Sequence, residues 1–371
     1  MKICFFIYSM GFGGAERTVS YLANYGIDNG VDVDVAIIDK NTNTYKLDDK
    51  VKVHNIGFGL NVQKRHKTIF GKVYGVINSI LKIKRNFARY LKENKPDAVF
   101  CMSETVVKYV PKNTRAKIFG TERSNPSWIK SKSKLKQRIK AYNRCDAMVF
   151  QTKRAMQYYE GKIFVKNQVV IPNAIGNELC YKVVYDAKSL EKKICAVGSL
   201  RAQKDYPTLL KAFEIVLKKH SDFKLEIFGE GYDKDNLKAL SEKLKISKNI
   251  DFKGNDLEAL KKISNAYCYV MSSISEGMPN ALMEAMAIGM PCVSTDCNNG
   301  PAELIENEKN GLLVPIQNPE VLAGALCKMI ENRKFAEGCG KEATKILKTN
   351  SIEEISKRYF EFINSIIKDK K

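Results

Sequence analysis

The sequence predicts an α/β protein with two doubly wound, Rossmann-like domains that face each other across a cleft. Two series of alternating strand and helix patterns, one in each half of the chain, carry this prediction, because such alternation builds a parallel sheet with helices on both faces. A length of 371 residues favours two domains over one, and a hydrophobic content of 44% is enough for two cores. Ligands bind at the carboxyl ends of the strands in such sheets, so the loops there are the candidates for function.

The first series opens with a strand over residues 3–8, a glycine-rich loop over 11–14, a helix over 15–28 and a strand over 31–38. The helix is indicated by apolar residues at helical spacing, and the strands are indicated by short apolar runs. Further strands are expected at 98–102, 116–120, 147–150 and 169–171.

The second series begins after a polar stretch at 173–193, which separates the two halves. Its strands are expected at 194–198, 224–228, 250–253, 266–272 and 291–295, and its helices at 206–219, 233–244 and 280–288. We therefore expect domains over 1–175 and 190–350, followed by an amphipathic helix over 351–371 that packs back on the first domain.

The most informative stretch is Ser-Glu-Gly-Met-Pro-Asn-Ala-Leu-Met-Glu at 275–284. It places Glu276 in the loop after an expected strand, and Glu284 eight positions later inside the next helix. The unpaired amides and the positive dipole of the helix start lie between them and attract anions. Two carboxylates beside an anion site suit a ligand with both phosphate and hydroxyl groups, such as a nucleotide sugar. The alternative is that both glutamates are solvated.

In each domain, the loop after the first strand is a further candidate for function. Gly13 and Gly14 stand in a Gly-Phe-Gly-Gly loop, which lacks the spacing of a dinucleotide site but lets the backbone approach a ligand. A simple tight turn explains that loop equally well. Arg201 and Lys204 stand in Gly-Ser-Leu-Arg-Ala-Gln-Lys, where two cations can neutralise a departing diphosphate. The alternative there is a solvated basic loop.

A third loop, Gly-Thr-Glu-Arg-Ser-Asn-Pro at 120–126, ends a strand of the first domain. Arg123 in this loop either binds a phosphate of an acceptor or pairs with Glu122. Asp32 and Asp34 form an Asp-Val-Asp pattern, but they alternate with valines along a strand, so we expect both to be solvated rather than to hold a metal. The three histidines lie far from any cysteine cluster, so a zinc site is not expected.

Five motifs follow one another along the chain: Gly-Gly-Ala-Glu-Arg at 13–17, Ile-Pro-Asn at 171–173, Gln-Lys at 203–204, Glu-x7-Glu at 276–284 and Gly-Pro-Ala-Glu at 300–303. In order and spacing they resemble the retaining glycosyltransferases of family 4, which have the GT-B fold and need no metal or other cofactor. The resemblance implies transfer of a sugar from a nucleotide diphosphate donor to an acceptor hydroxyl. The first domain would bind the acceptor and the second the nucleotide sugar. The motifs argue against the alternatives of a nucleotide-sugar epimerase or a phosphorylase of similar fold.

The resemblance also assigns catalytic and donor-binding roles. Glu276 would contact the transferred sugar, while Lys204 and Arg201 would stabilise the leaving diphosphate. Glu284 would bind the ribose hydroxyls, and the helix-start amides would hold the diphosphate. The donor site is expected to comprise Gly13, Gly14, Gly198, Ser199, Gly277, Met278, Pro279, Asn280, Ala281, Leu282, Glu284 and Glu303.

The chain departs from the family pattern at two of these places. Ser199 occupies the usual place of an arginine, and Arg201 is its candidate replacement. Arg123 stands where many relatives carry a histidine, so a histidine-assisted role is not implied. Arg123 and Glu122 are instead expected to bind the acceptor.

The net charge of +21 is concentrated in the first half. Residues 61–144 hold 22 lysines and arginines against four acidic residues, which favours anionic lipid or nucleic acid as a partner. No recognised nucleic-acid motif accompanies the charge, so we expect no nucleic acid. A predicted helix carries Lys82, Lys84, Arg85 and Arg89 beside apolar residues, which predicts a peripheral contact with an anionic membrane. The alternative is that the apolar residues face the core and the lysines are solvated.

The cysteines and the lengths of the apolar runs indicate a cellular location. The ten cysteines show no pairing pattern, which favours a reducing cytoplasm, and no apolar run approaches the length of a membrane span. We therefore expect a protein at the inner face of the membrane. A polyprenyl-diphosphate-linked glycan would be presented there as acceptor, with a UDP-sugar as donor.

Overall fold

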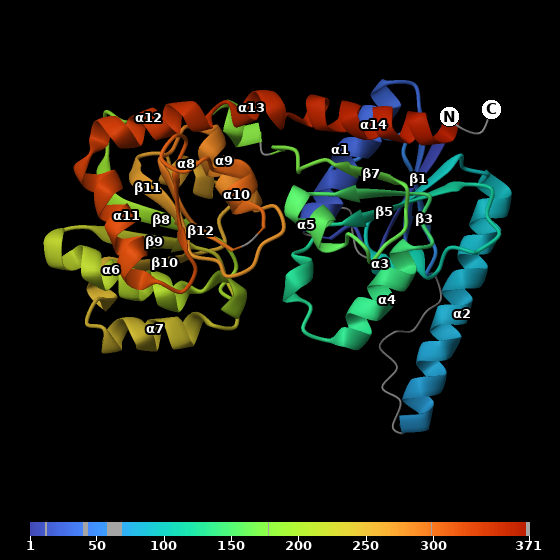
Figure 1. Ribbon diagram of the computed structural model, residues 1–371, viewed down its shortest axis with the longest axis horizontal. Helices are drawn as coiled ribbons and strands as arrows, with labels where there is room; N and C mark the ends of the chain where they lie inside the picture. Colours follow the sequence, from blue (N-terminus) through green and yellow to red (C-terminus); the bar gives the residue numbers. More distant parts are fainter. Residues whose placement is uncertain (12, 40–43, 58–68, 177, 298, 369–371) are drawn as a thin grey trace. The chain divides into compact units, whose positions relative to one another are not determined.

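The computed structural model describes residues 1–11, 13–39, 44–57, 69–176, 178–297 and 299–368, with only the backbone for 69–76 and no side-chain environment for 179. The chain forms two compact units (Figure 1). The first unit combines Met1–Ala174 with Ile352–Lys371, and the second is Ile175–Ser351.

The first unit is a parallel sheet with the strand order β3-β2-β1-β4-β5-β6-β7. Its strands are β1 Lys2–Ile7, β2 Asp32–Ile37, β3 Lys52–Asn55, β4 Ala98–Cys101, β5 Lys117–Glu122, β6 Ala147–Phe150 and β7 Asn167–Val170. Its helices are α1 Gly14–Asp28, α2 Ile69–Asn94, α3 Glu104–Val107, α4 Lys132–Tyr142, α5 Lys153–Tyr158 and α14 Ile352–Lys368. Successive residues of β1 serve two cores, because Phe6 packs with Phe87 of α2 while Phe5 joins the cluster that contains α1 and α14.

The final helix belongs to the first unit. Phe360 of α14 lies against Tyr25 of α1, with 5.4 Å between the ring centroids. A Cβ atom on Gly26 would lie 2.8 Å from the Phe360 ring, so the glycine lets the two helices approach. The chain thus returns to its first unit after completing the second.

The second unit has the strand order β10-β9-β8-β11-β12-β13, again with parallel neighbours. Its strands are β8 Glu191–Val197, β9 Lys224–Phe228, β10 Ile250–Gly254, β11 Ala266–Met271, β12 Cys292–Asp296 and β13 Leu312–Pro315. Its helices are α6 Tyr206–Lys219, α7 Lys234–Lys243, α8 Ala259–Ile263, α9 Asn280–Ala287, α10 Pro301–Leu304, α11 Pro319–Glu331, α12 Arg333–Ala343 and α13 Ile346–Thr349. The order reverses between β8 and β11, which is where doubly wound sheets bind ligands.

The predicted fold class of two doubly wound domains is confirmed. Two strands were not predicted, β3 and β13. Both are four-residue edge strands, and β3 holds one aliphatic residue, Val53, so neither shows a clear period. Among the described residues, no helix has the length and apolar character needed to cross a membrane.

Candidate active site

The centre of the candidate site is an ion pair at the switch point of the second unit. Lys204, in the loop after β8, places its Nζ 2.6 Å from Oε1 of Glu276, in the loop after β11. The hydroxyl of Ser273 donates to the same carboxylate oxygen at 2.6 Å. Both charged side chains are largely enclosed, with exposed fractions of 17% for Lys204 and 9% for Glu276. The structure therefore brings together two of the predicted catalytic residues.

Hydrogen bonds to the backbone hold the loops that carry this pair. The Ser272 hydroxyl donates to the carbonyl of Lys204 at 2.8 Å, and the Ile274 N–H donates to the carbonyl of Gln203 at 2.9 Å. The side-chain amide of Asn299 donates to the carbonyl of Glu276 at 3.1 Å. Loops after β8, β11 and β12 are thereby fixed to one another.

The predicted anion site is the start of α9. Pro279 precedes the helix and no side chain caps it, so the amides of the first turn lie where an anion can use them. Leu282 and Met278 are buried in the core, so only their backbone can serve a ligand. Glu284 lies one turn into the helix and is half-buried.

Close backbone approach explains two glycines of the second unit. A Cβ atom on Gly300 would lie 2.1 Å from the carbonyl oxygen of Gly277 and 2.7 Å from Pro279. A Cβ atom on Gly229, whose φ is +144°, would lie 2.0 Å from the carbonyl oxygen of Gly198. Gly229 was not predicted, although its place directly after β9 in Phe-Gly-Glu-Gly was a usable signal.

The third predicted catalytic residue, Arg201, and two predicted donor residues, Ser199 and Glu303, lie in different environments. Arg201 is exposed, and its side chain forms no hydrogen bond or ion pair with any described residue. Ser199 is half-buried and accepts a backbone hydrogen bond from Arg201 at 2.9 Å. Glu303 is half-buried in the short helix α10. The structure thus does not join Arg201 to the Lys204–Glu276 pair.

In the first unit, Arg123 binds the start of α1, directly after the glycine-rich loop. Its guanidinium donates to Thr18 Oγ1 at 2.7 Å and to Asn173 Oδ1 at 2.8 Å, and it lies 3.4 Å from the carbonyl oxygen of Gly14. Burial lowers the pKa of Arg123. Gly13 and Gly14 therefore open α1 directly beside this cation, whereas Phe12 lies outside the described residues.

Of the two alternatives for Arg123, the pairing with Glu122 is not formed. Glu122 is the last residue of β5 and is buried, and its carboxylate binds a different set of partners from those of Arg123. Its carboxylate accepts hydrogen bonds from Ser124, Arg138, Tyr142 and Tyr159. Because both oxygens are engaged inside the unit, the geometry favours a supporting role for Glu122 over the predicted contact with an acceptor.

The prediction that both aspartates of Asp-Val-Asp are solvated is also wrong for Asp34. Asp34 is fully buried, and its Oδ2 accepts a hydrogen bond of 2.6 Å from Tyr90. Lys2 and His54 lie 3.0 and 3.4 Å from the same oxygen. Burial raises the pKa of Asp34, but these partners outweigh it and lower the pKa to about 2. These partners within the protein balance the negative charge of the Asp34 carboxylate.

One group of side chains in the described part of the chain has a metal-binding arrangement. Ligand atoms of His220, Cys327 and Glu331 lie within 4.8 Å of one another. His220 follows the end of α6 and precedes β9, so the group lies at the amino end of the sheet, opposite the Lys204–Glu276 pair. It takes no part in the candidate site.

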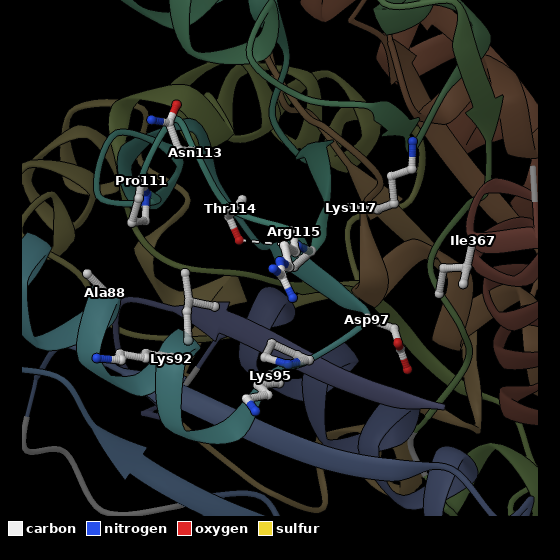
Figure 2. Close-up of a pocket in the computed structure, with 13 residues that line it drawn as sticks. Ala88, Lys92, Lys95, Asp97, Pro111, Asn113, Thr114, Arg115, Lys117 and Ile367 are labelled. Atoms are coloured by element: carbon white, nitrogen blue, oxygen red, sulfur yellow. Dashed lines mark hydrogen bonds between the residues drawn. The ribbon is translucent and has the colours of Figure 1, made fainter. Parts of the chain in front are cut away.

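Two of the cavities formed by the described residues of the first unit are sizeable. One, of about 590 Å³, is near the amino ends of β4 and β5, and Figure 2 shows Lys92, Lys95, Arg115 and Lys117 around it. The other, of about 970 Å³, is lined by α3, α4 and the turn before α4, with Lys84 of α2. The second cavity adjoins the loop that follows β5.

Comparison with known proteins identifies the class. Residues 181–346 match the family described as glycosyl transferases group 1, and residues 12–178 match glycosyltransferase family 4. A crystal structure of a point mutant of TarM from S. aureus, in complex with fondaparinux, α-GlcNAc-glycerol and UDP, superposes with a TM-score of 0.78. It is 17% identical and covers 98% of this chain and 99% of its own. The protein is a glycosyltransferase with the GT-B fold.

Two curated relatives are also named as glycosyltransferases. An uncharacterized glycosyltransferase of Haemophilus influenzae is 28% identical over 339 residues, covering 89% of this chain and 91% of its own. A Campylobacter jejuni protein is 25% identical over 374 residues, covering 99% of each chain. It is named GalNAc-alpha-(1->4)-GalNAc-alpha-(1->3)-diNAcBac-PP-undecaprenol alpha-1,4-N-acetyl-D-galactosaminyltransferase. The chain is thus a GT-B glycosyltransferase of the family 4 type, and the predicted enzyme class is confirmed.

Proposed function

We propose that this enzyme is a retaining, metal-independent glycosyltransferase that transfers a sugar from a UDP-sugar to a lipid-linked glycan. The observation that carries the proposal is the enclosed Lys204–Glu276 pair next to the uncapped start of α9. A cation and the backbone amides at the uncapped start of α9 suit the negative charge that develops on a departing diphosphate. The UDP bound by the structural neighbour TarM supports the choice of nucleotide.

Each group has a defined part in the proposed reaction. The bond between the sugar C1 and the β-phosphate oxygen breaks, and C1 bonds to the acceptor oxygen on the same face. The acceptor proton passes to the departing phosphate. Lys204 and the amides of 280–282 stabilise the diphosphate, Glu276 orients the transferred sugar, and Glu284 binds the ribose. Because Lys204 and these amides supply the positive charge, the reaction needs no divalent cation.

The acceptor assignment is supported by the name of the Campylobacter relative, whose substrate carries a diphospho-undecaprenol. A lipid acceptor requires the enzyme to work at a membrane surface. In α2, Ile80 and Ile83 pack toward the core, whereas Ile77 and Leu81 are 52% and 60% exposed. The apolar residues of this helix therefore divide between the core and an exposed face.

We infer that the exposed face of α2 docks on the cytoplasmic face of an anionic membrane. Arg85 and Arg89 are exposed and extend the Ile77–Leu81 face by one and two turns. An exposed apolar pair beside cations is typical of a peripheral contact. The predicted basic region begins with Lys64, Arg65 and Lys67, which lie outside the described residues, and the side chain of Lys72 does too.

Vesicle flotation tests the membrane contact. We expect recovery with anionic vesicles that falls as salt rises, and loss of most of it in Arg85→Gln/Arg89→Gln. Lys238→Gln/Lys243→Gln on α7 is the matched control, because it removes the same charge from exposed helix positions of the second unit. Equal recovery with neutral and anionic vesicles would contradict the proposal.

A panel of nucleotide sugars tests the reaction. The enzyme is incubated with lipid extracts that contain diphosphate-linked glycans, and released nucleotide and the anomeric configuration of the product are measured. We expect release from a UDP-sugar, an α-linked product from an α-linked donor, and unchanged rates in EDTA. Inversion at C1 or a full loss of rate in EDTA would overturn the corresponding part of the proposal.

A further inference from the structure

We propose that the basic cavity of about 970 Å³ in the first unit binds a phosphate-bearing sugar, with Trp128 beside the sugar and lysines around the phosphate. This site deepens the proposed function, because it assigns the phosphate-linked part of the acceptor to named residues. The proposal therefore rests on the acceptor being linked through phosphate.

The charge of the cavity is one-sided. Seven lysines and arginines line it, against one acidic residue, Glu104. Two of the cations serve the fold itself, because Arg138 pairs with Glu104 at 2.7 Å and Arg144 donates to the carbonyl of Val107 at 3.1 Å. The other five are Lys84, Lys108, Lys130, Lys134 and Lys140, and none forms an ion pair with a described acid. Five uncompensated lysines around one concavity repel one another, and an anion bearing several charges would relieve that repulsion.

An aromatic ring lies among these lysines. Trp128 is 43% exposed and is the only tryptophan of the chain. The turn that presents it is fixed, since the Asn125 side chain accepts from the backbone N–H of Ser127 at 3.0 Å. Lys130 places its ammonium 5.6 Å from the centre of the indole. A flat apolar face next to cations suits a sugar ring that carries a phosphate better than it suits a bare phosphate.

The position of the cavity agrees with this ligand. Arg138 on its wall also pairs with Glu122 at 2.9 Å, and Glu122 ends β5. The cavity therefore adjoins the carboxyl end of the sheet, where ligands of doubly wound domains bind. The cavity in Figure 2 lies at the other end of the sheet, near Asp97 and Lys117, although it also contains several cations.

The single tryptophan gives a local readout of binding. Tryptophan fluorescence of the full-length enzyme is followed during titration with N-acetylglucosamine 1-phosphate, with inorganic pyrophosphate, with N-acetylglucosamine, and with vesicles of phosphatidylglycerol. We expect a saturable change with the sugar phosphate, a weaker response to pyrophosphate, and none with the neutral sugar. A change with vesicles but not with the soluble sugar phosphate would overturn the proposal and assign the lysines to a lipid surface.

Charge-matched variants separate the cavity from general electrostatics. Lys130→Gln/Lys134→Gln should weaken sugar-phosphate binding by about tenfold or more, because two charged partners are lost. Lys92→Gln/Lys95→Gln removes the same charge from the cavity at the other end of the sheet and should leave binding unchanged. Equal weakening in both would refute a specific site.

Titration with UDP separates this proposal from the proposed function. UDP affinity should be unchanged in Lys130→Gln/Lys134→Gln, since none of the proposed donor residues lines this cavity. Wild-type enzyme that binds UDP but shows no fluorescence change with sugar phosphate refutes the cavity alone. Enzyme that binds sugar phosphate but no UDP instead contradicts the proposed donor.

Discussion

Replacement of Lys204 by alanine tests whether the ion pair is catalytic as well as structural. Its Nζ lies 2.6 Å from Glu276, whose side chain is 9% exposed, so the substitution leaves a nearly buried carboxylate with Ser273 as its remaining side-chain partner. Breaking a buried ion pair by removal of one partner typically costs about 3–5 kcal/mol. Because Lys204 keeps 17% exposure, we expect the free energy of unfolding to fall by about 2–3 kcal/mol.

The catalytic effect of Lys204→Ala should be larger than its effect on stability. Loss of one preorganised partner of a developing oxyanion typically reduces kcat by about 100- to 1000-fold. We expect a loss of this size in single-turnover transfer, with chemical denaturation measured in parallel. Arg201→Ala is the control from the same loop, and its exposed side chain predicts a change in stability within about 0.5 kcal/mol.

A double-mutant cycle distinguishes the pair from two independent residues. Lys204→Ala/Glu276→Ala should cost less stability than the two single substitutions together, with a coupling of about 1–3 kcal/mol. Near-normal turnover of Lys204→Ala, accompanied by the expected loss of stability, would refute the catalytic reasoning and leave the pair a structural one. A loss in Arg201→Ala as large as that in Lys204→Ala would show that Arg201 replaces the family arginine.

Particular contacts in both units lead to three further predictions. Asp34→Asn should lower the free energy of unfolding by about 3 kcal/mol at neutral pH. In the wild type this stabilisation is present above the unfolded pKa of about 4 and is lost as pH falls toward the folded pKa of about 2. Acid-unfolding curves of both proteins would show this difference. Gly300→Ala should weaken UDP binding, because the added Cβ would overlap a backbone carbonyl. Gly324→Ala should instead raise the free energy of unfolding by about 0.5–1 kcal/mol, because Gly324 lies in α11 and an added Cβ would have no atom within 4 Å. By calorimetry, Glu284→Ala should weaken UDP binding, while Glu276→Ala should mainly slow transfer; equal and unchanged affinity in both would contradict their separate roles.

The elements with strong local patterns could be predicted from sequence. The helix at 206–219 and the strands at 147–150 and 224–228 agree residue for residue, because each combines regular apolar spacing with clear ends. The Lys204–Glu276 pair could also be expected, since both residues follow strands that meet at the switch point. Its partners Ser273 and Asn299 could not, because short polar residues in loops carry no pattern of their own.

The error at Asp34 has a general cause. Alternation along a strand separates two faces, but it does not say that either face meets water. In a parallel sheet covered by helices on both sides, the face opposite the valines is a second core, and α2 supplies Tyr90 to that face. An acidic residue at such a position has to be compensated, and Lys2 and His54 do this from the neighbouring strands.

The end of β5 shows how one strand can serve two sites. Glu122 is the last residue of β5 and Arg123 follows it directly, and their side chains bind different partners. Arg123 holds the start of α1 at the glycine-rich loop, while Glu122 holds Arg138 on the wall of the basic cavity. A shift of this strand end would therefore move the glycine loop and the cavity together. The anchor depends on an arginine, because one planar guanidinium donates to both Thr18 and Asn173.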